Sequence, residues 1–274
     1  MIHTLEMTVL IDNVAAEPLV GEWGLSILIT ADDRSILLDT GASHLFAQNA
    51  ERLGIDLNSV DTGVLSHAHY DHADGFVPLL RENPALKVYV RACVMKDCYA
   101  QKESGMEYIG VAPALLDAYE NRLVRVRGDH KLAEGVWLIP HKRPHRAQIG
   151  ARERMYTMRC CVLHPDDFSH EQSLVFETAK GLCIFNSCSH AGASEIIGEV
   201  CDTFPGRKVY AYVGGFHLYQ KAPDEVAQFA ERVEACGVEK IITGHCTGDA
   251  AFAILKERLG GRITQFHTGL ETDI

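Results

Sequence analysis

The sequence predicts an α/β fold, because short apolar strands alternate with helices along much of the chain. The alternation is clearest after residue 170, where helices follow strands directly. Four strands end at histidines, at positions 67 and 69, 190, 217 and 245. Because sites in α/β folds lie at the carboxyl ends of strands, this repetition indicates one shared site. The 274 residues suit a single domain spanning positions 1–274.

The first third is expected to be rich in strands. Asp32-Asp33 is predicted as a hairpin turn between two of them, and Gly54 ends the first helix as a C-cap. Strands are predicted over residues 7–12, 25–30, 35–39, 61–66 and 87–90, and helices over 46–53 and about 75–82.

The middle of the chain, at about 91–165, is expected to form a lid-like insertion. It contains a weak helix near 113–121 and short strands at 123–127 and 136–139. A basic stretch follows, made of Lys142, Arg143, His145, Arg146, Arg152 and Arg154. These cations either belong to a solvated loop or form a lid that contacts an anionic substrate.

The last third returns to a regular alternation of strands and helices. Lys180-Gly181 is a turn between two strands, and Pro223 lies near the first turn of a helix, where proline is favoured. Strands are predicted over residues 174–177, 182–186, 208–213 and 240–243, and helices over 193–202, 223–236 and 249–259.

Composition and charge exclude several classes of protein. The chain is 47% hydrophobic and 23% charged, as in globular domains and unlike disordered chains. It has 26 Lys and Arg against 37 Asp and Glu, a net charge of −11, so no nucleic-acid partner is expected. No apolar run reaches the ~18 residues of a membrane span. The first residues also lack the pattern of a secretory signal, so no membrane partner is expected.

The nine cysteines indicate a reducing compartment. Their number is odd and no two are spaced C-x-x-C. This spacing excludes a zinc ribbon and an iron–sulfur motif, and it argues against a disulfide framework. We therefore expect reduced thiols and a cytoplasmic protein; the oligomeric state has no signal in the sequence.

The strongest functional signal is the sequence His67-x-His69-x-Asp71-His72. In an extended segment residues two apart project to the same side, so His67 and His69 can bind one metal ion. Asp71 and His72 lie just beyond, where the chain turns, and can face a second ion. Imidazole and carboxylate are ligands for zinc, iron or manganese. Zinc is the expected cofactor, as one or two ions, with iron and manganese as alternatives.

Three motifs resemble those of the metallo-β-lactamase-fold superfamily. They are Leu38-Asp39-Thr40-Gly41, Leu65-Ser66-His67-Ala68-His69-Tyr70-Asp71-His72-Ala73-Asp74-Gly75 and Thr243-Gly244-His245. The resemblance implies an αββα four-layer sandwich with the site at one edge of the sheets. It also implies that Asp39 steadies the loops that carry the ligands without binding a metal itself.

Five further motifs carry a narrower resemblance. They are Glu22-Trp23-Gly24-Leu25-Ser26, Glu171-Gln172-Ser173-Leu174, Cys188-Ser189-His190-Ala191-Gly192, Gly214-Gly215-Phe216-His217-Leu218 and Thr243-Gly244-His245-Cys246-Thr247-Gly248. These motifs are similar to a subfamily that includes the archaeal dihydropterin–ribofuranosylaminobenzene-phosphate synthase and bacterial proteins called metal-dependent hydrolases.

The chain departs from the superfamily pattern in two places. The usual Gly-Asp pair, which supplies a bridging carboxylate, is replaced by Ser187-Cys188-Ser189-His190. The usual histidine of the third motif has no clear match in this chain, and His170 is the nearest candidate. We infer that His190 supplies the missing imidazole to the first ion, and that His245 completes the second position with Asp71 and His72.

The remaining polar residues of these motifs are assigned to catalysis or to support. Cys188 is expected to support the metal ligands without binding an ion itself. Direct ligation by its sulfur is the alternative. His217 is either a ligand or, as we favour, a residue that contacts the substrate or donates a proton. Asp71, His217 and Glu171 form the expected catalytic set.

These residues predict a metal-dependent hydrolase, with two ions expected, that acts on a small anionic substrate bearing a phosphate or an ester-like group. The resemblance to the synthase gives an alternative, a condensation that releases diphosphate while His217 or Glu171 handles a proton. A non-enzymatic, metal-dependent ligand-binding protein is a further alternative. The open arrangement of the histidines and the expected lid favour an enzyme.

Several other enzyme classes fit the sequence less well. Asp39-Thr40-Gly41 and Asp61-Thr62-Gly63 resemble aspartic protease motifs, but they begin only 22 positions apart, which is too short a separation to build two lobes. A flavodiiron oxidoreductase would have Glu in place of His69 and a flavin domain. A glyoxalase-type thioesterase would keep the Gly-Asp pair, and a nucleic-acid-processing member would carry an extra domain and more positive charge.

Overall fold

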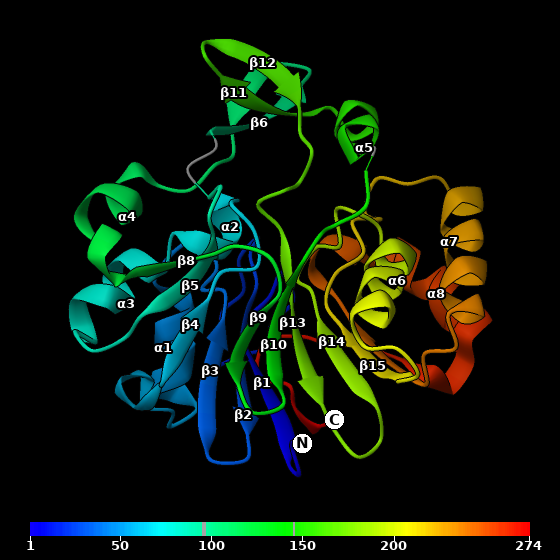
Figure 1. The fold of residues 1–274 in the computed structure, drawn as a ribbon, viewed down its shortest axis with the longest axis horizontal. Coiled ribbons are helices and arrows are strands. Elements are labelled where there is room, and N and C mark those ends of the chain that lie inside the picture. Colours follow the sequence, from blue (N-terminus) through cyan, green and yellow to red (C-terminus); the bar gives the residue numbers. More distant parts are fainter. Residues whose placement is uncertain (95–96, 145) are drawn as a thin grey trace.

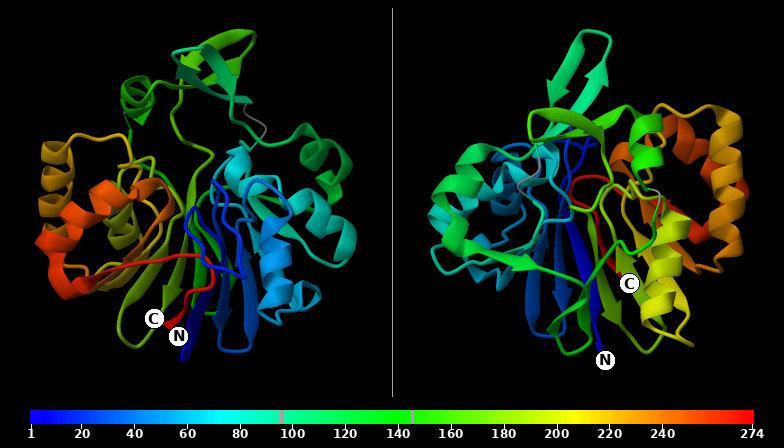
Figure 2. Two further views of the ribbon diagram at one scale, coloured as in Figure 1. Left: turned by 180° about the vertical axis from the view of Figure 1, so that it is seen from behind. Right: turned by 45° about the horizontal axis from the view of Figure 1, so that its top comes forward.

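The computed structural model of the protein describes residues 1–94, 97–144 and 146–274. Two large sheets lie face to face, helices cover both outer faces, and a small sheet lies across one end (Figure 1). Figure 2 shows the same layers from behind and from a tilted viewpoint. The fold is therefore the αββα four-layer sandwich that the sequence predicts.

The strands form two seven-stranded sheets and one four-stranded sheet. In spatial order the first large sheet contains β18 (Glu271–Asp273), β1 (Leu5–Ile11), β2 (Ser26–Ala31), β3 (Arg34–Leu38), β4 (Thr62–Val64), β5 (Val88–Arg91) and β8 (Leu123–Val126). The second contains β17 (Ile263–Gln265), β16 (Lys240–Thr243), β15 (Val209–Val213), β14 (Leu182–Phe185), β13 (Gln172–Glu177), β10 (Val136–Pro140) and β9 (His130–Ala133). The small sheet contains β12 (Val162–Pro165), β11 (Met155–Arg159), β6 (Asp97–Lys102) and β7 (Gly105–Tyr108).

The helices divide between the two outer faces. Beside the first large sheet lie α1 (Leu45–Arg52), α2 (Tyr70–Ala73), α3 (Phe76–Glu82) and α4 (Pro113–Ala118). Beside the second lie α6 (Ala193–Thr203), α7 (Pro223–Ala235) and α8 (Asp249–Leu259), and α5 (Arg146–Glu153) accompanies the small sheet. Among the described residues, no helix has both the length and the apolar character required to cross a bilayer.

Successive strand residues enter different cores, which explains the continuous apolar runs of the sequence. On β3, Ile36 and Leu38 enter the core between the two sheets, whereas Leu37 belongs to the core beneath α1 and α3. On β14, Phe185 faces the central core and Ile184 faces the helices of the second sheet. Both faces of each large sheet are therefore buried.

Parallel pairing brings the important strand ends to one edge of the sandwich. β3, β4 and β5 are parallel in the first sheet, and β14, β15 and β16 are parallel in the second. The loops after β4, β14, β15 and β16 contain the histidines singled out in the sequence. All four loops lie at the end of the sandwich that the small sheet covers (Figure 1).

The segment expected to form a lid-like insertion at about 91–165 is divided in the structure. β8, β9 and β10 extend the edges of the large sheets, because apolar residues such as Val126 and Leu138 fill the core between them. Only β6, β7, β11, β12 and α5 lie above the sandwich, and we call these elements the lid. His145 of the basic stretch lies outside the described residues.

Candidate metal centre

Three strand ends deliver polar side chains to one place between the sheets. Nε2 of His67 lies 3.3 Å from Nε2 of His190, which joins the loops after β4 and β14. Nε2 of His245 lies 3.5 Å from a carboxylate oxygen of Asp71, which joins the loops after β16 and β4. We call this buried site the metal pocket, formed by His67, His69, Asp71, His72, Cys188, His190 and His245.

The ligand atoms of the metal pocket fall into two groups. The first is His67, His69 and His190, and the second is Asp71, His72 and His245. Within each group the ligand atoms lie within 4.8 Å of one another, close enough to surround one ion. The rings of His67 and His72 are 4.2 Å apart, so the two groups adjoin. The structure therefore brings together the residues that the sequence assigns to each ion.

Asp39 fixes two of these histidines through their outer nitrogens. Its carboxylate accepts the O–H of Ser66 at 2.6 Å, so the Ser66 oxygen accepts from Nδ1 of His67 at 2.8 Å. The same carboxylate accepts from Nδ1 of His72 at 2.8 Å. Each ring therefore carries its proton on Nδ1 and turns the lone pair of Nε2 into the pocket, as a metal ligand requires. Asp39 thus supports the ligands from behind.

Asn13 fixes His245 in a similar way. The Asn13 amide nitrogen donates to the His245 carbonyl oxygen at 3.1 Å, so the amide oxygen faces Nδ1 of the ring, also at 3.1 Å. Because an amide oxygen only accepts, Nδ1 carries a proton, and Nε2 faces the carboxylate of Asp71. The adjacent Asp12 accepts the backbone N–H of His245 at 2.9 Å. The sequence does not predict a role for Asp12 or Asn13, because their one signal is a polar pair directly after a strand.

Unpartnered nitrogen atoms show that these residues fit a bound cation. Among the described residues, Nε2 of His69 is buried and makes no hydrogen bond, and Nε2 of His245 has only the carboxylate of Asp71 beside it, at 3.5 Å. An unpaired buried polar atom costs about 1–3 kcal/mol, so such atoms need a partner. A divalent ion provides one, and imidazoles with a carboxylate are donors that zinc, iron and manganese accept.

The loops around the pocket are held in uncommon backbone conformations. Left-handed backbone angles, with φ of 48–60°, occur at Asp39, Ser189, His217 and His245. Residues other than glycine adopt this conformation rarely, and often at functional sites. A Cβ atom at Gly214 would lie 1.8 Å from the carbonyl oxygen of Asn186, so glycine is needed where the loops after β14 and β15 meet.

The two groups differ in their electrostatics. In the first group, burial and neighbouring imidazoles lower the pKa of His69 to about 3, and the pKa values of His67 and His190 lie well below their usual range. In the second group, burial opposes the ion pair, but His72 and His245 still lower the pKa of Asp71. Contact with Asp71 outweighs burial and raises the pKa of His245 to about 9. The first group is therefore neutral, and the second contains an ion pair.

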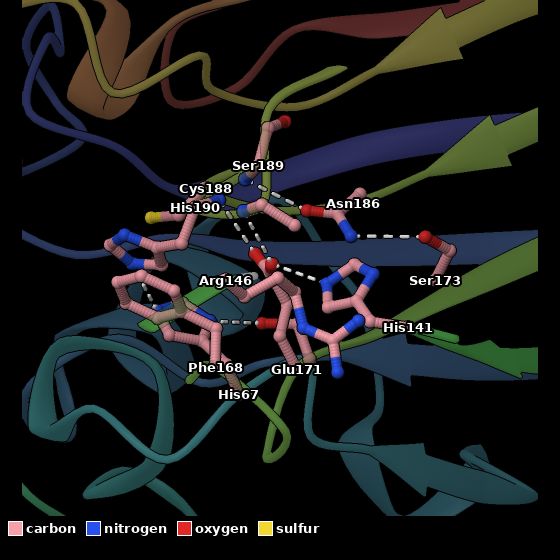
Figure 3. A network of polar contacts seen from close by, with 12 residues as sticks. His67, His141, Arg146, Phe168, Glu171, Ser173, Asn186, Cys188, Ser189 and His190 are labelled. Carbon is pink, nitrogen blue, oxygen red and sulfur yellow. Dashed lines mark hydrogen bonds and ion pairs between the residues drawn. The ribbon is translucent and has the colours of Figure 1, made fainter. Parts of the chain in front are cut away.

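Glu171 lies behind His190 and does not line the pocket (Figure 3). Its two carboxylate oxygens accept the backbone N–H groups of His190 at 3.0 Å and Ala191 at 3.2 Å. His141 contacts Glu171 at 2.5 Å through Nε2 and Glu199 at 2.8 Å through Nδ1. The two carboxylates outweigh burial and raise the pKa of His141. This geometry gives Glu171 a positioning role, in place of the proton transfer expected from the sequence. The supporting role of His141 is not predicted from the sequence.

His170, the nearest match to the third-motif histidine, also supports a loop. The backbone N–H of Ala68 donates to its Nδ1 at 3.1 Å, so the ring proton lies on Nε2, where Asp166 accepts it at 3.0 Å. Ligand atoms of His69, Cys98, Asp166 and His170 lie within 4.8 Å of one another. Both nitrogens of His170 are nevertheless occupied by hydrogen bonds, so this cluster is not a second metal site.

A cavity of about 80 Å³ lies directly over the metal pocket. Trp23, His217 and Tyr219 line it together with Lys102 and Met155 of the lid. The Trp23 ring lies 5.0 Å from that of His245 and 5.1 Å from that of Tyr219. His217 is half-buried and belongs to neither ligand group, so its position suits contact with a substrate rather than ligation.

A larger cavity of about 430 Å³ adjoins the first and shares Lys102, Met155, His217 and Tyr219 with it. Its cations are Lys102, Arg152, Arg154 and Lys221, and its carboxylates are Glu103 and Glu153. We call this cavity the basic chamber. A cavity of about 550 Å³ beside α1 and α3 is larger still but contains none of the ligand residues.

The basic stretch seen in the sequence splits into two sets. Lys142 pairs with Asp129, Arg143 with Glu195 and Asp202, and Arg146 with Glu199. These three cations are therefore neutralised within the protein, which argues against the alternative that the whole stretch contacts an anionic substrate. Of the described residues of the basic stretch, Arg152 and Arg154 are the two that line the basic chamber.

Residues 24–151 match the sequence model of the Metallo-beta-lactamase superfamily. Over this region the chain is similar to that superfamily. The matched region includes Asp39 and the loop with His67, His69, Asp71 and His72. The second Asp-Thr-Gly sequence has no part in the metal pocket, because Asp61 is exposed and accepts the backbone N–H of Ser35 on β3.

Known proteins resemble the chain over nearly its full length. A Methanocaldococcus jannaschii relative named 7,8-dihydropterin-6-methyl-4-(beta-D-ribofuranosyl)-aminobenzene-5'-phosphate synthase is 27% identical over 265 residues, 92% of this chain and 90% of its own. A solved metal-dependent hydrolase of the beta-lactamase superfamily is 27% identical, with a TM-score of 0.82, and covers 98% of this chain and 99% of its own. The metallo-beta-lactamase fold protein YhfI from Bacillus subtilis is 13% identical, with a TM-score of 0.61, and the match covers 99% of this chain and 100% of YhfI. At this identity the likeness shows a shared fold and nothing more. The chain is thus similar to proteins named as a synthase and as a hydrolase.

Proposed function

We propose that the protein is a two-metal hydrolase that acts on small phosphate-bearing substrates. One observation carries the proposal: two adjoining ligand groups lie beneath a chamber in which cations outnumber carboxylates. Divalent ions, with zinc expected, would be held by His67, His69 and His190 and by Asp71, His72 and His245. Such ions activate water and stabilise developing negative charge when they are bound.

The basic chamber supports an anionic substrate. It presents four cations, Lys102, Arg152, Arg154 and Lys221, against two carboxylates, Glu103 and Glu153, so its net charge is +2 in a chain of net charge −11. Arg152 contacts Glu153 at 2.9 Å, and Lys221 also pairs with Glu153. Among the described residues, Lys102 and Arg154 have no recorded carboxylate partner, so they are the cations that bind a phosphate group.

Two aromatic residues and His217 complete the substrate site in this proposal. Trp23 and Tyr219 form an apolar wall beside His245 and exclude water from the reacting group. His217 lies where the metal pocket meets the basic chamber, so its imidazole can give a proton to the leaving group.

A condensation that releases diphosphate is the second candidate function. It is favoured by the name of the 27% identical relative, a synthase, and the basic chamber is able to accept a diphosphate group. Reaction in ¹⁸O-labelled water separates the two reactions, because hydrolysis places the label in a product and condensation does not. A metal-loaded protein that binds a phosphate ester and never converts it would instead support a ligand-binding function.

The decisive experiment combines elemental analysis with a panel of phosphate and carboxylate esters. We expect two ions per chain and a preference for phosphate esters. Lys102→Ala with Arg154→Ala should raise KM for a phosphate ester about tenfold while metal content stays unchanged. Lys87→Ala, an exposed lysine at the opposite end of β5, is the matched control. Protein that retains no ion, or that hydrolyses neutral esters equally well in wild type and double variant, contradicts the proposal.

A further inference from the structure

We propose that the thiolate of Cys188 is a ligand shared by both metal positions, in place of the bridging carboxylate usual in the superfamily. This inference rests on the two-metal centre proposed above. Cys188 lies in the loop after β14, within the Ser187-Cys188-Ser189-His190 sequence that stands where the resemblance leads one to expect the Gly-Asp pair. The loop would otherwise bring only His190 to the ions, and the two positions would lack a common anionic ligand.

The position of the sulfur atom supports this role. Cys188 is buried, and its Sγ lies 3.3 Å from Nε2 of His72. Its sulfur and the ligand atoms of His67 and His72 lie within 4.8 Å of one another. Cys188 also forms a cluster of this size with His245 and Cys246. Cys188 therefore adjoins His67 of the first group and both imidazoles of the second.

Cys246 is the competing thiol, and its contacts direct it elsewhere. Its Sγ accepts the backbone N–H of His217 at 3.3 Å and lies 3.7 Å from the carbonyl oxygen of Cys188. Among the described residues, Cys246 belongs to the cluster with Cys188 and His245, which contains no member of the first group. Of the two thiols, only Cys188 is placed to serve both positions.

The turn that carries Cys188 is fixed by hydrogen bonds on both sides. The side-chain oxygen of Asn186 accepts the backbone N–H of Ser189 at 2.8 Å, and the Asn186 amide nitrogen donates to Ser173 at 3.0 Å (Figure 3). The Ser189 hydroxyl donates to the carbonyl oxygen of Gly215 at 2.6 Å. These bonds hold the Cys188 sulfur at the pocket without a change in the loop.

The chemistry of the step is ligand exchange. Metal binding displaces the thiol proton to solvent, and the sulfur, now a thiolate, uses separate lone pairs for the two ions. A thiolate favours soft or borderline ions, so this pocket should select zinc over magnesium or manganese. No oxidation or further reactant is involved.

The test uses the full chain freed of metal and reloaded with two equivalents of ¹¹³Cd²⁺, whose nuclear magnetic resonance moves downfield with each sulfur ligand. We expect two downfield resonances in wild type, in Cys246→Ser and in the control Cys183→Ser, whose thiol lies in the central core. Both resonances should move upfield in Cys188→Asp, which keeps an anionic ligand without sulfur. Cys188→Ser should in addition weaken retention of an ion by roughly tenfold or more.

The outcomes separate this inference from the proposed function. Resonances that do not move in Cys188→Asp overturn the thiolate ligand, and movement of a single resonance overturns its sharing by both ions. Two retained ions without any sulfur signature in wild type overturn the inference but leave the two-metal centre intact. Wild-type protein that retains no cadmium overturns both.

Discussion

The two ligand groups of the metal pocket are prepared for cations in different ways. His67, His69 and His190 are neutral, because burial and mutual repulsion lower their pKa values. In the second group, Asp71 and His245 already form an ion pair, which raises the pKa of His245 to about 9. An ion that enters the first group meets imidazoles with free lone pairs, whereas an ion that enters the second must displace a proton from His245. Adjacent sites with similar residues therefore differ in their competition with protons.

The largest effect on metal binding and turnover is expected from a substitution in the first ligand group. His67→Ala removes an imidazole that lies in the first group and beside His72 of the second. We expect loss of at least one ion per chain and a fall in turnover of more than about 100-fold, since even supporting residues contribute 10–100-fold. Elemental analysis, ester hydrolysis and thermal unfolding check this. His44→Ala removes an exposed imidazole and is the control. Normal metal content and turnover in His67→Ala would refute a metal mechanism.

A smaller loss is expected when the support shared by both groups is weakened. Asp39→Asn removes the charge that holds Ser66 and His72, and through Ser66 it affects His67. The affinity for both ions should fall about 10–100-fold, measured by competition with a chelator. Asp61→Asn is a matched control, because Asp61 begins the other Asp-Thr-Gly sequence but lies at an exposed turn. A loss confined to one ion would show that Asp39 does not couple the groups.

The ligand loops could be predicted from sequence because a metal ligand is restricted to a few residue types at strand ends. The supporting residues could not, because they act across large sequence separations. Asn13 contacts His245 from 232 positions away, and His141 acts on His190 only through Glu171. No periodicity or motif records a contact of this kind.

The small sheet was missed for a different physical reason. All four residues of β7 are exposed, and β12 is largely exposed, so neither strand has the apolar alternation by which strands are recognised. The two alternatives for the basic stretch, a solvated loop or a lid that contacts the substrate, could not be separated from the sequence for a related reason. Arg143 and Arg154 are equivalent in the sequence, but only contacts show that Arg143 is neutralised by Glu195 and Asp202.

The pH dependence of metal binding should separate the two positions. Ordinary imidazoles would predict that both ions are lost below about pH 6. Because His245 is protonated below its raised pKa, the affinity at the second position should fall about tenfold for each pH unit below pH 9. The imidazoles of the first position add no such loss between pH 8 and pH 6, since the pKa of His69 is about 3, so the affinity there should fall less steeply than at the second position. Two ions that weaken in parallel in a chelator titration would remove the distinction drawn here.

The smallest effect concerns the support behind the first group. In the metal-free protein, His141→Gln removes the positive charge between Glu171 and Glu199 and should lower the free energy of unfolding by about 1.5 kcal/mol. The pKa of His141 is raised on folding, so its stabilising contribution is fully present below the unfolded value near 6.5 and is lost as the pH rises through the folded value. The difference from wild type should therefore be larger at pH 6 than at alkaline pH. Urea unfolding at several pH values measures it, with His164→Gln, an exposed histidine of β12, as the control. A difference that grows with pH would mean that His141 is neutral between the two carboxylates, and that only hydrogen bonds hold Glu171 behind His190.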